Sequence, residues 1–69
     1  MMIKAIFLPR GREERKIDIA ENSTGLDLLN TLKLSPDVHI LVRNKIPIPL
    51  DEELVDGEKI RIINVVSGG

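Results

Sequence analysis

The sequence of 69 residues contains no cysteine, no tryptophan and no tyrosine, and Phe7 is its single aromatic residue. Without cysteine the chain has no disulfide, no thiol nucleophile and no thiolate ligand for zinc. His39 is the only histidine, so neither a Cys–His pair nor a conventional zinc set can be assembled. The three serines, Ser23, Ser35 and Ser67, stand in turn, cap or tail contexts. We therefore expect no enzyme activity from this chain alone, and no metal or cofactor bound by it.

The sequence also lacks an excess of charge of either sign. Ten basic and eleven acidic residues give a formal net charge of −1. There is no basic stripe for a phosphate backbone and no aromatic platform for bases, so direct binding of nucleic acid is not expected. The apolar start of the chain is too short for a signal sequence or a membrane span. These features predict one small cytoplasmic domain, away from membranes and monomeric.

Hydrophobic periodicity predicts two strands and then a helix in the first half of the chain. Residues 2–8 are almost continuously apolar, and residues 15–20 alternate, with Ile17 and Ile19 on one face. Thr24 and Asp27 have the spacing of a capping box, and leucines recur at helical spacing after them. We expect a hairpin followed by a short amphipathic helix over residues 25–33.

The second half of the chain predicts three more strands. We expect a strand over residues 38–43, a tight turn at Asn44-Lys45 and a short edge strand over residues 46–50. The acidic run at residues 51–53 is expected to begin a helical turn that ends at residue 55 and to stay solvated. Asp56-Gly57 is a turn signal, and residues 58–65 alternate as the last strand.

The order β-β-α-β-β-β predicts an α+β domain. A right-handed crossover would place the last strand parallel to the first, in the centre of a mixed sheet of four to five strands. A helix this short covers one face of such a sheet. This is the β-grasp, or ubiquitin-like, arrangement. It predicts one domain over residues 1–65 and a flexible tail over residues 66–69.

The sequence closes on Gly68-Gly69, directly after the last predicted strand. Two residues without a Cβ can thread a narrow channel and adopt backbone angles closed to other residues. A terminal glycine carboxylate is also the least hindered acyl group that a protein can present. Once coupled to AMP it can be attacked by sulfur, giving a thiocarboxylate, or by a lysine amine, giving an isopeptide bond. We expect Gly68 and Gly69 to be the site of activation.

From Asp56 to Gly69 the sequence combines a D-G turn, an alternating strand and a terminal V-x-G-G. In this respect it resembles the ubiquitin-like sulfur carriers ThiS and MoaD and the small archaeal modifier proteins. The stretch Arg43-Asn44-Lys45 resembles the hairpin of that family, although Lys45 stands where glycine is usual. The resemblance implies a carrier adenylated at Gly69 by an E1-like enzyme of the ThiF/MoeB type, which itself binds Mg-ATP.

The resemblance also implies a docking surface on the sheet face away from the helix. Strand alternation predicts that it contains Leu41, Arg61, Ile63 and Val65, and we expect Val66 to belong to it as well. The sulfur could pass to an accepting enzyme in thiamin, molybdopterin or thiolated-tRNA synthesis, or the carrier could be joined to lysines of target proteins. Another hypothesis is a binding module that conjugates to nothing, because residues 7–11 and 23–27 faintly resemble TGS domains of RNA-handling proteins.

Overall fold

The computed structural model describes residues 1–8 and 13–65. Its strands are β1 (Met2–Leu8), β2 (Glu13–Asp18), β3 (His39–Arg43), β4 (Ile46–Ile48) and β5 (Lys59–Asn64). A single α-helix, α1 (Gly25–Thr31), follows the β1–β2 hairpin, and a 3-10 helix (Pro36–Val38) leads into β3. The predicted order of elements is therefore confirmed.

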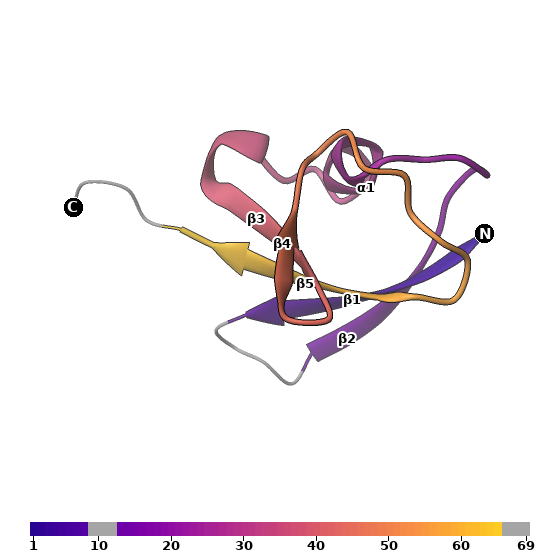
Figure 1. The fold of residues 1–69 in the computed structure, drawn as a ribbon, viewed down its shortest axis with the longest axis horizontal. Coiled ribbons are helices and arrows are strands. Elements are labelled where there is room, and N and C mark those ends of the chain that lie inside the picture. The colour runs from indigo at the N-terminus through magenta and orange to yellow at the C-terminus, as the bar shows by residue number, and fades with distance from the viewer. Residues whose placement is uncertain (9–12, 66–69) are drawn as a thin grey trace.

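The five strands form one mixed sheet in the order β2-β1-β5-β3-β4, with α1 on one face (Figure 1). β1 and β5 pair in parallel at the centre, and the other pairs are antiparallel. A parallel pair requires a crossover connection, which the segment containing α1 provides. The β-grasp prediction is confirmed, and β5 is the strand that leads towards the end of the chain (Figure 1).

The hydrophobic core lies between α1 and the sheet. Burial of apolar area stabilises the fold by roughly 25 cal/mol per Å² removed from water. Leu28 and Leu29 of α1 are fully buried, as are Ile60 and Ile62 at alternate positions of β5. The whole core cluster comprises Ile3, Ala5, Ile17, Ile19, Leu28, Leu29, Leu41, Leu54, Ile60 and Ile62. The face of the sheet turned away from α1, which we call the open face, carries the alternate side chains of the strands.

Helix α1 begins with the predicted capping box. The backbone N–H of Thr24 donates to Asp27 Oδ2 (2.9 Å), and the N–H of Asp27 donates to Thr24 Oγ1 (3.3 Å). Two further N–H groups at this end, of Gly25 and Leu26, donate to the carbonyl oxygens of Glu52 and Leu50. Free donors at a helix start are thus satisfied by a segment distant in sequence.

The prediction of a helical turn over residues 51–55 is wrong. A turn at Leu50-Asp51 leads into an extended segment, in which Glu53 forms an isolated bridge with Thr24. The Leu54 N–H donates to the Ser23 carbonyl (2.8 Å). These backbone groups pair with the start of α1, so they are not available for a local helical turn.

The tight turn at Asn44-Lys45 is confirmed. Asn44 has a φ of 50° and Lys45 a φ of 68°, as a two-residue hairpin of the primed type requires. The lysine that replaces the usual glycine therefore adopts the left-handed conformation itself.

No helix among residues 1–8 and 13–65 is long and apolar enough to cross a membrane.

Candidate functional site

The open face brings together most of the predicted docking residues. Arg61 and Ile63 of β5 alternate with the buried Ile60 and Ile62, so they point away from α1 and are half-buried. Val65 follows on the same alternation and is 37% exposed. Three of the five predicted residues therefore share one face, in a line along the strand that leads to the tail.

The placement of Leu41 on this face is wrong. Leu41 is fully buried and pairs with Ile62, so it points into the core under α1. A Cβ added at Gly25 would lie 2.5 Å from Leu41 Cδ1, which shows how closely the helix start packs on it. A shift of one residue moves every side chain of a strand to the other face. The neighbouring Ile40, which is 40% exposed and pairs with Ile63, takes the place predicted for Leu41.

The open face continues across the sheet in two rows. Leu8 and Ile40 flank Ile63 on either side in one row, and Ile6 and Val42 flank Arg61 in the next. The first row is apolar and partly exposed, an arrangement typical of the centre of a protein–protein contact. We call Ile40, Arg61, Ile63 and Val65 the docking patch.

The remaining predicted site residues, Val66, Gly68 and Gly69, lie outside the described residues, as does the whole tail predicted over residues 66–69. The chain is anchored just before them. The Val65 N–H donates to the Val38 carbonyl (2.8 Å), and Asn64 pairs with His39. The docking patch therefore extends to Val65, the last described residue.

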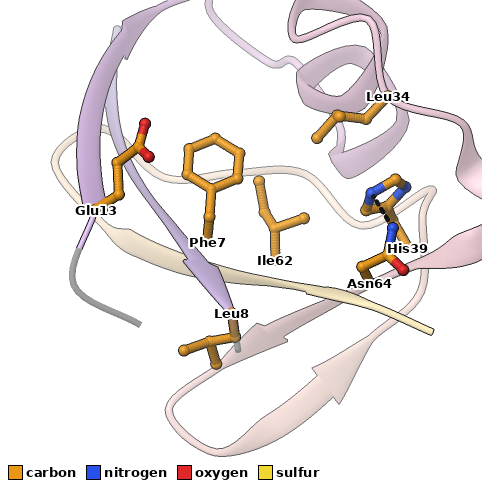
Figure 2. Close-up of a pocket in the computed structure, with 7 residues that line it drawn as sticks. All are labelled: Phe7, Leu8, Glu13, Leu34, His39, Ile62 and Asn64. Atoms are coloured by element: carbon orange, nitrogen blue, oxygen red, sulfur yellow. Dashed lines mark hydrogen bonds between the residues drawn. The ribbon is translucent and has the colours of Figure 1, made fainter. Parts of the chain in front are cut away.

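On the opposite side of the sheet, near the end of β5, the structure has an open cavity of about 420 Å³. Figure 2 shows Phe7, Ile62 and Leu34 directed towards it, whereas Leu8 points to the other side of the sheet. His39 and Asn64 lie together at one edge of this cavity (Figure 2).

The ring of His39 is held by two hydrogen bonds. Its Nδ1 lies 2.7 Å from the Ser35 carbonyl oxygen, which can only accept, so Nδ1 carries the proton. Its Nε2 then accepts from Asn64 Nδ2 at 3.2 Å. Both ring nitrogens are engaged in local structure, which favours a packing role for His39 over a catalytic one.

Arg43 forms the main ion-pair cluster of the described residues. Its Nε lies 2.7 Å from Glu58 Oε1 and its Nη1 2.9 Å from Glu52 Oε2. Arg43 Nη2 also donates to the Glu53 carbonyl, at 3.0 Å. The cluster ties β3 to the long connection before β5. Glu52, from the acidic run, thus helps to hold the long connection against β3. Among residues 1–8 and 13–65, no group of acidic residues and histidine could hold a metal ion.

The cluster shifts the pKa of Glu58. Burial alone would raise that pKa, but hydrogen bonds from Arg43 and the Val55 N–H, with the charge of Arg43, lower it below its ordinary value of 4.5. The hydrogen bond to Glu58 in turn raises the pKa of Arg43, although burial opposes this. Both groups are therefore charged at neutral pH, in a structural ion pair at the edge of the core.

A lowered carboxylate pKa predicts loss of stability in acid. Glu58 contributes fully above its unfolded-state pKa, and this contribution disappears as the pH falls through the lower folded-state pKa. Between about pH 6 and pH 3 the wild-type free energy of unfolding should fall more steeply than that of Glu58→Gln, as urea unfolding would measure. Glu21→Gln, at an exposed turn, is the control and should keep the wild-type slope. Equal slopes for wild type and Glu58→Gln would contradict this assignment.

The chain resembles other proteins along almost its whole length. The family model of small archaeal modifier protein 2 matches residues 1–66. An uncharacterised protein of Archaeoglobus fulgidus is 26% identical over 70 residues, which is 100% of both chains. The solved structure of the ubiquitin of Caldiarchaeum subterraneum has a TM-score of 0.74 at 24% identity, over 100% of this chain and 98% of the other. SAMP1 from Haloferax volcanii has a TM-score of 0.74 at 18% identity, over 100% of both chains.

The strand order, the helix α1 and these structural likenesses define a ubiquitin-like fold. Because the family model covers residues 1–66, the chain belongs to the small archaeal modifier protein 2 family. The resemblance to small archaeal modifiers expected from the sequence is confirmed. The matched span ends at Val66, so Gly68 and Gly69 lie beyond it.

Proposed function

We propose that this protein is a ubiquitin-like carrier that an E1-like adenylating enzyme activates at Gly69. The observation that supports it most is that a chain of the small archaeal modifier family closes on Gly68-Gly69, just after the central strand β5. In this role the chain is a protein substrate in the cytoplasm, and the activating enzyme binds Mg-ATP.

The chemistry starts at the Gly69 carboxylate, which is a poor electrophile while ionised. Its oxygen attacks the α-phosphorus of ATP, pyrophosphate leaves and a mixed anhydride with AMP forms. A sulfur nucleophile can then displace AMP to give a thiocarboxylate, or a lysine amine can displace it to give an isopeptide bond. The two fates share the first step, and the globular domain supplies the surface that the partner recognises.

The docking patch has the position that this role needs. It lies on β5 and β3, and Ile63 is six residues before Gly69, so the two cannot be more than about 22 Å apart along an extended chain. Val65 continues the patch towards the tail, and Arg61 adds one charge at its other end. Apolar anchors at the centre of such a contact carry most of the binding free energy.

Truncation of the patch should weaken recognition and spare the chemistry. In pyrophosphate exchange with the cognate activating enzyme, the double variant Ile40→Ala, Ile63→Ala should raise KM by about 30-fold or more, because each of the two lost anchors costs about 1 kcal/mol or more. The kcat should stay close to wild type. Ile46→Ala is the control, since Ile46 is 65% exposed and lies off the patch. An unchanged KM for the double variant would refute the placement of the contact.

A further inference from the structure

Three lysines stand in one row across the open face, next to the docking patch. Lys4 of β1 pairs with Lys16 of β2 on one side and with Lys59 of β5 on the other. The flanking positions Ile3, Ala5, Ile17 and Ile60 are buried in the core, so all three lysines point away from α1. We call Lys16, Lys4 and Lys59 the lysine row.

This row works against the stability of the fold. Directly opposite side chains on neighbouring strands are separated by about 5 Å at Cβ, and like charges there are destabilising. The ion pairs found in the described part of the chain involve Arg43 and the Met1 ammonium, and none involves a lysine of the row. Of the carboxylates on this face, Asp18 lies 3.6 Å from the Met1 nitrogen, and Glu14 is opposite Ile6.

The row is continuous with a graded surface along β5. Lys59, Arg61, Ile63 and Val65 follow one another on the open face, from cationic to apolar, over roughly 20 Å at 3.3 Å per residue. Lys16 and Lys59 are exposed and Lys4 is half-buried. In the long connection, Glu52 and Glu58 pair with Arg43, and Asp56 Oδ1 accepts from the Met2 N–H at 2.8 Å. Among the described strand positions, the open face therefore carries four cations, Lys4, Lys16, Lys59 and Arg61, and two carboxylates, Glu14 and Asp18, which flank Lys16 on β2.

We propose that the lysine row, with Arg61, binds an acidic segment of a partner protein. Carboxylates of such a segment would reduce the repulsion of Lys4 from its two opposite neighbours, because no lysine of the row forms an ion pair in the described part of the chain. A protein partner fits better than a nucleic acid, because the cations occupy one compact end of the face and apolar side chains continue from it. Phe7, the only aromatic residue, points to the other side of the sheet, so no base can stack here.

The test uses the full-length, isotope-labelled protein and three probes at low salt: poly-glutamate, poly-lysine and poly-uridine RNA. Poly-glutamate should shift the amide resonances of Lys4, Lys16, Lys59 and Arg61 and should bind more tightly than the RNA. Lys4→Glu with Lys59→Glu should weaken poly-glutamate binding by about tenfold or more, because close charges are reversed. The matched control is Lys33→Glu with Lys45→Glu, which makes the same change of net charge away from the row and should stay within about twofold of wild type.

Thermal unfolding provides a second measurement, because a mere folding defect would also reduce binding. Lys4→Glu alone should raise the Tm, since it places a carboxylate between two lysines. Added salt should raise the Tm of the wild type more than that of this variant. Tighter binding of RNA than of poly-glutamate, equal weakening in the control variant, or a lower Tm for Lys4→Glu would each overturn the proposal. It does not depend on activation of Gly69, so it can fail or hold separately from the proposed function.

Discussion

Removal of Gly69 is expected to reduce adenylation of this protein by at least about 100-fold. The deletion moves the terminal carboxylate back by about 3.5 Å, and a misplacement of even 1 Å at a reacting group can cost about 100-fold in rate. The measurement is pyrophosphate exchange with the cognate activating enzyme and ATP. The Tm should not change, because the core and the Val65 anchor are intact in the truncated chain.

A second tail variant separates loss of the glycine pair from loss of length. Deletion of Ser67 shortens the tail equally but preserves Gly68-Gly69 at its end, so it should retain more activity than the Gly69 deletion. If the Gly69 deletion were as active as wild type, the carrier function would be wrong. The protein would then be better described as a binding module that is not conjugated to other molecules, as the faint resemblance to TGS domains suggests.

Leu28→Ala is expected to lower the free energy of unfolding by about 3–4 kcal/mol. Leu28 is fully buried between α1 and the sheet, and truncation of a buried leucine loses its transfer free energy and leaves a cavity. A domain of this size has a total stability of only about 3–10 kcal/mol, so the variant should be close to unfolding. Urea titration followed by far-ultraviolet circular dichroism measures this, since the chain has no tryptophan or tyrosine.

The matched control lies two residues earlier on the same helix. Leu26 is 38% exposed, so Leu26→Ala removes the same atoms from a site that water already reaches. Its effect should stay below about 1 kcal/mol. Similar losses for the two variants would contradict the position of the core between α1 and the sheet.

The parts of the fold that the sequence predicted correctly depend on local patterns. In β5, the apolar Ile60 and Ile62 alternate with the charged Lys59 and Arg61. This pattern alone predicts which side chains are buried, whatever the neighbouring strands are. The start of α1 follows from Thr24, whose side chain satisfies a backbone donor within the same turn. Such signals involve groups a few residues apart, and tertiary contacts did not override them.

The errors arose where distant segments decide the structure. β3 has apolar side chains at successive positions, Ile40, Leu41 and Val42, so alternation alone does not identify its buried face. The register of pairing between β3 and β5 determines which face of β3 is buried. The extended conformation at Glu53 cannot be predicted from the local sequence for the same reason, because its partners are backbone groups at the start of α1.

The two charged clusters also depend on pairing between distant segments. Arg43 meets Glu58 across 15 positions of the chain, and Lys4 meets Lys59 across the parallel β1–β5 pair. In the sequence each of these residues is one charge among many. Their contacts follow only from the register of the sheet and the path of the long connection.

Activation at Gly69 can be tested by the intact mass of the untagged protein purified from its own cells. If Gly69 is activated, a fraction of the protein should be heavier by the mass difference between sulfur and oxygen, located at Gly69. Alternatively, tryptic peptides of other proteins should carry on their lysines the segment that follows Arg61 and ends in Gly69. Activation at Gly69 would be contradicted if the terminus were always a plain carboxylate and no such branched peptides were found, even when an activating enzyme and ATP are supplied.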